Sequence, residues 1–173
     1  MRQVLQDVTY RVRSMALVHE KLYQSADLAH IDFAEYTRGL LSYLWRAHGA
    51  IAAAVRMTFD LEPVLLPTDT AVTCGLILNE LAVNALEHAF TGRADGELTI
   101  SLHSGVDGRT RLCVADNGVG LPRNLDWRQS SSLGLRLVKM LSKQLDSTVE
   151  VSSEGGTTFE IAFEHPDASP PLS

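Results

Sequence analysis

Two short segments of the chain carry polar side chains whose types and spacing could do chemistry. The first, residues 79–85, reads Asn-Glu-Leu-Ala-Val-Asn-Ala within an apolar helical run, and it places Glu80 and Asn84 four residues apart on one helix face. A carboxylate and a carboxamide in a mostly buried helix are costly without partners. Magnesium and phosphate oxygens would be such partners, but a bridged pair within the protein would satisfy both side chains equally well.

The second segment, residues 116–120, reads Asp-Asn-Gly-Val-Gly and follows the apolar residues 112–115. A carboxylate at the end of an apolar strand can accept a hydrogen bond from an exocyclic amine such as that of adenine. Gly118 and Gly120 would let the backbone approach a flat ring and turn with a positive φ. Asp-Asn-Gly is also a common turn sequence, so this segment alone does not separate a base-binding turn from an ordinary one.

Two further glycine-containing segments follow. Residues 132–135, Ser-Leu-Gly-Leu, lead into a helix, whose first backbone N–H groups are a ready site for phosphate oxygens. Residues 155–159, Gly-Gly-Thr-Thr-Phe, enter the last strand, and the Thr157 hydroxyl could reach a polar network at the base. A plain hairpin turn would explain the second of these segments as well.

The elements that must position these residues are predicted from hydrophobic periodicity and turn residues. Helices are expected over residues 4–24, from Asp32 to Gly49, and over 68–88 and 133–145. Strands are expected over residues 55–61, 97–104, 110–115, 147–153 and 157–163. Short turns between neighbouring strands favour antiparallel or mixed pairing. The predicted class is therefore α+β, a two-layer α/β sandwich with helices on one sheet face, preceded by one amphipathic helix.

Composition narrows the function classes. The 173 residues, 45% hydrophobic and 21% charged, fit one compact domain with one accessory element. A net charge of −6 with scattered basic residues argues against nucleic-acid binding. Cys74 and Cys113 lie in apolar stretches and are expected to be small buried hydrophobes. Because no apolar run reaches the roughly 18–20 residues of a membrane span, and no signal peptide is recognisable, a cytoplasmic location is expected.

Four segments together resemble a known family. Residues 76–90 resemble the N box of two-component sensor histidine kinases, more narrowly of the HisKA-2 subgroup. Residues 116–120, 132–135 and 155–157 fall in the order and approximate spacing of that family's three glycine-rich boxes. Residues 11–23 resemble the second helix of the subgroup's dimerisation and phosphotransfer hairpin.

This resemblance covers about residues 8–163 and implies the Bergerat-type ATPase fold. It divides the chain into a partial dimerisation and phosphotransfer hairpin at 1–26, an ATP-binding catalytic domain at 27–165, and a disordered tail at 166–173. The implied ligands are ATP and magnesium. The implied protein partners are the receiver domain of a response regulator and a second copy of the chain, bound through the N-terminal helix.

The resemblance also assigns roles to single residues. Asn84 would be the magnesium ligand, Asp116 the adenine anchor, and Glu80 a catalytic carboxylate that orients water or the metal. Residues 123–131 would form a short lid over the phosphates, with Arg123 and Arg128 as candidate phosphate contacts. The other residues expected to bind the nucleotide are Gly118, Gly120, Ser132, Leu133, Gly134 and Thr157.

The sequence departs from the family pattern in two places. Family members commonly carry a lysine three residues after the N-box asparagine, where this chain has Glu87. A carboxylate cannot neutralise phosphates, so either phosphate affinity or catalysis would be weakened, or His88 or a lid arginine would take over this role. The six histidines include none in an acceptor box; His19 precedes an acid, but its surroundings resemble the second hairpin helix. The chain is therefore expected to be a fragment, or a short protein, without the acceptor helix.

The predicted function is the ATP-binding catalytic part of a sensor histidine kinase. It would pass the γ-phosphoryl of ATP to a histidine, for relay to a response regulator, without autophosphorylating on its own. One alternative is a serine protein kinase of the anti-sigma-factor type, which needs no acceptor histidine. The other is a degenerate, non-catalytic scaffold for phosphotransfer or dimerisation, which Glu87 favours and the intact Glu80, Asn84, Asp116 and Gly120 disfavour.

Overall fold

The computed structural model describes residues 29–164 and four residues nearer the N-terminus, Thr9, Val12, Ala16 and Glu20. These four are helical, but most of the amphipathic helix expected over 4–24, including His19, lies outside the described residues. The expected domain boundary at residue 26 and the expected tail at 166–173 lie outside them too.

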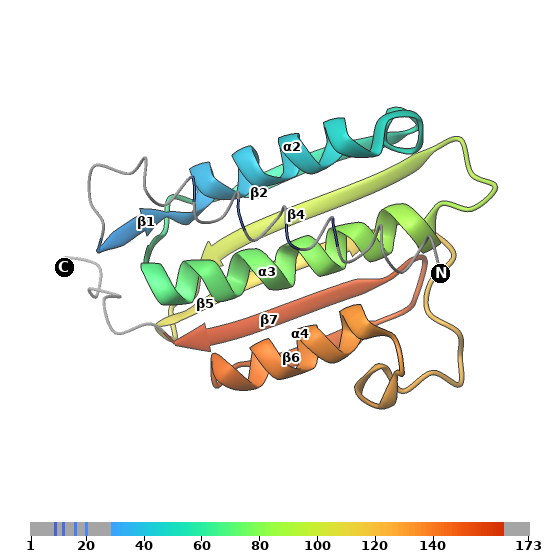
Figure 1. Cartoon of the computed structure of the whole chain (residues 1–173). Helices are drawn as coiled ribbons and strands as arrows, with labels where there is room; N and C mark the ends of the chain where they lie inside the picture. Colours follow the sequence, from blue (N-terminus) through green and yellow to red (C-terminus); the bar gives the residue numbers. More distant parts are fainter. Residues whose placement is uncertain (1–8, 10–11, 13–15, 17–19, 21–28, 165–173) are drawn as a thin grey trace.

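The described part of the chain contains both helices and strands, with several strands following one another directly (Figure 1). In order they are β1 (His30–Asp32), α2 (Phe33–Ala53), β2 (Val55–Leu61), β3 (Leu65–Pro67), α3 (Thr68–Asn84), η1 (Ala85–Ala89), β4 (Gly96–Ser104), β5 (Arg109–Asp116), η2 (Trp127–Gln129), α4 (Leu133–Gln144), β6 (Thr148–Ser152) and β7 (Thr158–Glu164).

The larger sheet has the strand order β2-β4-β5-β7-β6 and is mixed. β2 pairs in parallel with β4, and all other neighbours in this sheet pair antiparallel. The helices α2, α3 and α4 lie side by side on one face of it (Figure 1). The predicted α+β class, with a mixed sheet and helices on one face, is confirmed.

The hydrophobic core lies between this sheet and its helices. Along β4 and β5 buried residues alternate with partly exposed ones, because successive side chains of a strand point to opposite faces. Ile100, Leu112 and Ile161, from the three central strands, are fully buried and share one core cluster with Ile77 and Leu78 of α3. The sheet therefore presents one apolar face to the helices and one polar face to solvent.

The ends of α2 follow local sequence signals in part. Asp32 caps the helix as predicted, since its Oδ1 accepts the N–H groups of Ala34 and Glu35 at 3.0 and 3.1 Å. The helix does not end at Gly49 as expected: it kinks there, at φ 48°, and continues to Ala53. None of the helices in the described part of the chain combines the length and apolar character needed to cross a membrane.

A small antiparallel sheet of β1 and β3 was not predicted. It pairs Ile31 with Leu66 and lies at the start of α2 and α3. The two cysteines are free and differ in burial. Cys74 in α3 is buried as expected, whereas Cys113 is only half-buried, because its position on β5 alternates with the buried Leu112 and Val114.

The helix α3 positions the first chemistry-bearing segment. It is buried over most of its length, including Asn79 and Glu80 at 2% exposure each. Beyond Asn84 the chain continues as a π-helical turn, η1, where the sequence predicted regular α-helix to residue 88. Such turns are rare and concentrate at functional sites. Here the turn ends at Ala89, whose carbonyl accepts the N–H of Val119 at 2.9 Å.

We expect Gly75→Ala to destabilise the protein by about 1–3 kcal/mol through overpacking, although alanine normally favours a helix over glycine by about 1 kcal/mol. A Cβ at Gly75 would lie 2.6 Å from the hydroxyl and 2.8 Å from Cε1 of Tyr36, and Tyr36 is itself buried. Urea denaturation measures the free energy of unfolding.

The matched variant is Tyr36→Phe, because the buried Tyr36 hydroxyl has no hydrogen-bond partner among the described residues. Combined with Gly75→Ala, it should reduce the loss of stability. A Gly75→Ala protein as stable as the unmodified chain would contradict this packing of α2 against α3.

Candidate functional site

A cavity of about 390 Å³ lies between α3, η1, the end of β5, the segment after β5 and the start of α4. Its walls are largely apolar and include Leu81, Ala85, Val114, Leu121, Leu135 and Phe159. Its polar lining comes from Asn84, His88, Asp116, Ser130, Ser132 and Thr157. An apolar pocket with a few convergent polar groups is the usual form of a small-molecule site.

Asp116 stands at the end of β5 and is held there by backbone donors. Its Oδ1 accepts the N–H of Gly118 at 2.9 Å and that of Thr157 at 3.1 Å. Burial raises the pKa of this carboxyl above its ordinary value, and the hydrogen bonds from Gly118 and Thr157 lower it in part. The result is a fixed, partly desolvated acceptor that lines the cavity.

Two glycines allow the chain segments around Asp116 to come this close. A Cβ on Gly118 would overlap the carbonyl of Ala89, and a Cβ on Gly156 would overlap the carbonyl of Asp116. Gly156 also has a φ of 134°, which side chains other than glycine rarely adopt. The glycine-rich segments therefore serve to bring η1, the end of β5 and the turn before β7 into contact around one carboxylate.

Asn84, at the end of α3, contributes a second polar group to the lining. Its Nδ2 is buried and has no hydrogen-bond partner among the described residues, although the side chain lines the cavity. A buried amide is normally satisfied, so this group is available to a ligand in the cavity. The amide can present N–H to a phosphate oxygen or its carbonyl oxygen to a hard cation.

Glu80 lies one helical turn before Asn84 but does not line the cavity. Within the described residues no group of three or more His, Cys, Asp or Glu side chains could hold a metal ion. Magnesium commonly binds one or two protein ligands together with substrate phosphates and waters. The residues present fit a magnesium ion that would arrive with a phosphorylated ligand, since the Asn84 side chain lines the cavity and would supply a single protein ligand.

Glu87, which stands at the family's lysine position, and its neighbour His88 differ in their relation to the cavity. Glu87 does not line the cavity, whereas His88 does. The His88 side chain is 74% exposed, and its Nε2 lies 3.9 Å from the Glu87 carboxylate. The carboxylate that breaks the sequence pattern therefore stays outside the cavity, and an imidazole stands at its rim.

The segment expected to form a lid is anchored by a residue that the sequence analysis missed. Trp127, in η2, is buried and meets the Phe159 ring edge-on at 5.6 Å. The Arg128 guanidinium lies 5.0 Å from the Trp127 ring centre and donates to the carbonyl of Val149 at 3.2 Å. A single aromatic residue within a polar stretch was the available signal, since tryptophan seldom lies free in solvent.

The remaining predicted residues fall in different places. Ser132 caps α4 by accepting the N–H of Leu135 at 3.3 Å and lines the cavity. Gly120 and Thr157 line the cavity, and Gly118 is buried behind it. The residues that do not line it are Leu133, which is exposed, Gly134, which is buried, and the candidate phosphate contacts Arg123 and Arg128.

Comparison with known protein families identifies the family of this fold. The sequence model of the histidine kinase-, DNA gyrase B- and HSP90-like ATPases matches residues 70–167. The HisKA_2 histidine kinase model matches residues 1–48. The chain belongs to the histidine kinase-, DNA gyrase B- and HSP90-like ATPase family, and its N-terminal part is similar to the HisKA_2 histidine kinases.

Individual relatives are similar over most of this chain. Blue-light-activated histidine kinase 2 of Erythrobacter litoralis is 35% identical over 79% of the chain, which spans 41% of that protein. Sensor histidine kinase PdtaS of Mycobacterium tuberculosis is 31% identical over 86% of the chain, which spans 29% of that protein. The chain thus covers less than half of these relatives. The solved histidine kinase domain of the Erythrobacter litoralis EL346 blue-light activated kinase superposes with a TM-score of 0.81 at 27% identity, covering 94% of this chain and 81% of that one.

We expect Asp116→Asn to unfold at a higher urea concentration than the unmodified chain at pH 7. Asparagine can still accept both backbone hydrogen bonds but carries no charge in this partly buried place. A raised pKa means that the folded protein binds the proton more tightly than the unfolded chain does, so the carboxyl lowers stability as the pH rises. The advantage of the variant should disappear below about pH 4, near the ordinary pKa of aspartate.

Urea denaturation between pH 4 and pH 8 measures this difference. Asp126→Asn is the matched control, because Asp126 also accepts a backbone N–H, from Arg128 at 3.0 Å, but is exposed. The control should show no gain in stability at pH 7. An Asp116→Asn protein less stable than the unmodified chain at that pH would contradict the account of Asp116.

Proposed function

We propose that this chain is the ATP-binding catalytic part of a two-component sensor histidine kinase. It binds ATP and transfers the γ-phosphoryl group to a histidine side chain, from which the phosphoryl passes to the receiver domain of a response regulator. The observation that carries the proposal is the cavity itself, whose lining combines the held carboxylate of Asp116 with the Asn84 amide, which has no hydrogen-bond partner among the described residues. Membership of the ATPase family supports ATP as the ligand.

In this proposal the base end of the cavity recognises adenine. The Asp116 carboxylate accepts a hydrogen bond from the exocyclic amine, and Thr157 lies beside it on the cavity wall. The apolar lining, including Val114, Leu121 and Phe159, gives a flat ring a surface to pack against. Because Asp116 is fixed by two backbone donors, it is placed to discriminate bases that lack an amine at that position.

The phosphate end is formed by Asn84, Ser132 and His88. The first backbone N–H groups of α4, beyond the Ser132 cap, are suited to phosphate oxygens. Magnesium, held by the Asn84 side chain and by phosphate oxygens, would supply the positive charge that phosphoryl transfer requires. The imidazole of His88 provides a further donor at the rim in place of the family's lysine.

The catalytic task of the chain is positioning and charge stabilisation, since the acceptor imidazole is itself the nucleophile. Leu125 and Ser130, on either side of Trp127, line the cavity, so this anchored segment would limit access of water to it. Glu80 is buried one helical turn before Asn84. In this proposal its carboxylate orients water or the cation. We place this reaction in the cytoplasm, because its proposed substrates are ATP and a response regulator. The N-terminal helix would mediate homodimerisation.

The alternative functions have less support. The HisKA_2 match over residues 1–48 favours a histidine kinase over a serine kinase of the anti-sigma-factor type. The feature that favoured a degenerate scaffold was Glu87, and this residue does not line the cavity.

The test supplies the chain with magnesium and with ATP that carries a radioactive γ-phosphate. It measures transfer of the label to a separately produced dimerisation and phosphotransfer domain of a related histidine kinase. We expect labelled acceptor whose phosphate is lost in acid and retained in alkali, as for phosphohistidine. Asn84→Ala should abolish the labelling, because it removes the amide at the phosphate end, while Arg111→Ala, on the solvent face of the sheet, should not. Acid-stable label on serine, or no transfer by a chain that binds ATP, would contradict the proposal.

A further inference from the structure

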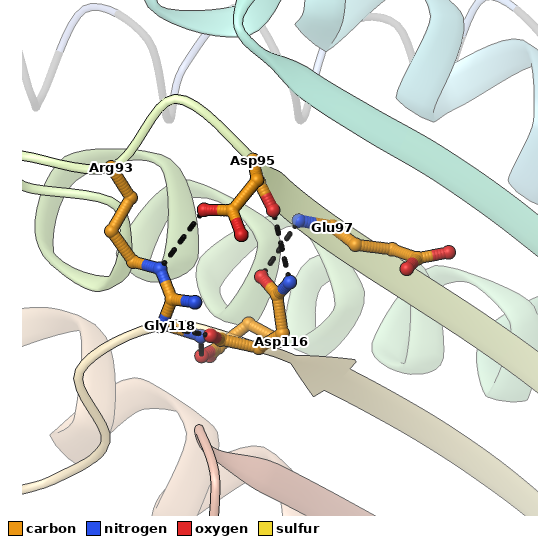
Figure 2. Close-up of polar contacts among 6 residues, drawn as sticks. Arg93, Asp95, Glu97, Asp116 and Gly118 are labelled. Atoms are coloured by element: carbon orange, nitrogen blue, oxygen red, sulfur yellow. Dashed lines mark hydrogen bonds and ion pairs between the residues drawn. The ribbon is translucent and has the colours of Figure 1, made fainter.

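The loop between η1 and β4 is tied to the Asp116 turn by a network of hydrogen bonds (Figure 2). Asn117, the residue after Asp116, uses all four of its polar groups in this network. Its backbone N–H donates to the carbonyl of Glu97 at 3.1 Å, and its carbonyl accepts from Nη1 of Arg93 at 2.7 Å. Its Oδ1 accepts the N–H of Glu97 at 2.8 Å, and its Nδ2 donates to the carbonyl of Asp95 at 3.0 Å.

This network, which we call the Arg93–Asn117 clamp, begins where regular strand pairing ends. The ladder between β4 and β5 ends with Leu98 opposite Asp116, and the contacts between Glu97 and Asn117 extend it past the strand. The Arg93 Nε also contacts the Asp95 carboxylate at 3.4 Å, which holds the guanidinium over the turn. Both the peptide and the side chain of Asn117 are therefore fixed.

The clamp connects the Asp116 turn to the segment that follows the helix of Asn84. The loop from Arg93 to Glu97 follows η1, which continues the helix that carries Asn84. The carbonyl of Ala89, in η1, accepts the N–H of Val119, two residues beyond Asn117. The turn that carries Asp116 is thus fastened on both sides of Gly118 to the segment that follows Asn84.

We propose that Arg93 and Asn117 are positioning residues for base recognition, which hold the Asp116 carboxylate in the orientation that selects adenine. This inference rests on the proposed function, because it assumes that Asp116 accepts a hydrogen bond from the base. Neither residue lines the cavity, so both act through Asp116. They set the selectivity of the site for an amine-bearing base.

Because the clamp side chains are partly exposed, a role in positioning Asp116 can be distinguished from a role in stabilising the fold. The side chains of Arg93 and Asp95 are 37% and 79% exposed, and exposed ion pairs contribute little to stability. Loss of Arg93 should therefore leave the melting temperature nearly unchanged. A binding group must nevertheless be held to within about 0.5 Å to work, so release of the Asn117 carbonyl should be felt at the neighbouring carboxylate.

The experiment measures, by calorimetry with magnesium, the Kd of ATP and of purine riboside triphosphate, which lacks the exocyclic amine. The variants are Arg93→Ala and Asn117→Asp, which keeps the acceptor for Glu97 but loses the donor to Asp95. Arg111→Ala is the matched control, because it removes an arginine–aspartate pair, with Asp107, near the opposite end of β5. Thermal unfolding of each variant establishes that it is folded.

The unmodified chain should bind ATP more tightly than the analogue. Each clamp variant should weaken ATP binding by about five- to tenfold, the effect of one lost hydrogen bond, and leave analogue binding unchanged, so that the preference for ATP falls. Arg111→Ala should keep the full preference.

Folded clamp variants that keep the full preference for ATP would overturn the inference and leave the proposed function standing. An equal loss of preference in Arg111→Ala would also overturn it, because the effect would then not belong to the clamp. An unmodified chain that binds no ATP, or binds both compounds equally, would instead overturn the proposed function and this inference with it.

Discussion

Asp116 keeps a carboxylate partly buried at the end of β5, where desolvation raises its pKa, and the surrounding structure is arranged to make that burial tolerable. Two backbone N–H groups, from Gly118 and Thr157, meet the same oxygen. For both donors to reach it, η1 and the turn before β7 must come so close that a Cβ on Gly118 or Gly156 would overlap backbone atoms. The glycine-rich segments are thus a consequence of one buried charge.

The same constraint connects the distant parts of the site. The Arg93–Asn117 clamp and the hydrogen bond from Val119 to Ala89 fasten the Asp116 turn to the segment that follows Asn84. The helix α3, buried over most of its length, fixes Asn84 relative to the sheet. The proposed adenine and phosphate ends of the cavity therefore belong to one rigid frame, while His88 and the segment around Trp127 complete its rim. In this account the protein contributes geometry and leaves the nucleophile to the acceptor histidine.

Sequence patterns predicted those features that depend on residues close together in the chain. Period-two alternation located β2 and β4, Asp32 was recognisable as a helix cap, and residue types singled out Asn84 and Asp116. What depended on tertiary contacts was missed. The strands β1 and β3 are too short for any periodicity, η1 ends at a carbonyl bonded to Val119, and Trp127 lies in a stretch whose sequence resembles a polar loop.

The shared helix face of Glu80 and Asn84 did not reveal that only Asn84 lines the cavity, because α3 is apolar on nearly every side. Asn117 looked like an ordinary turn residue, because its partners precede it by some twenty positions.

The central claim is that a single pocket binds ATP, with Asp116 recognising the adenine base and Asn84 contacting the phosphate end. Calorimetric titration with ATP, with and without magnesium, on the unmodified chain and on folded Asp116→Asn tests it most directly. The account predicts magnesium-dependent binding by the unmodified chain and its loss in the variant, because the carboxamide presents an N–H group where the base needs an acceptor. ATP binding of equal strength in both proteins, or none by the unmodified chain, would contradict it.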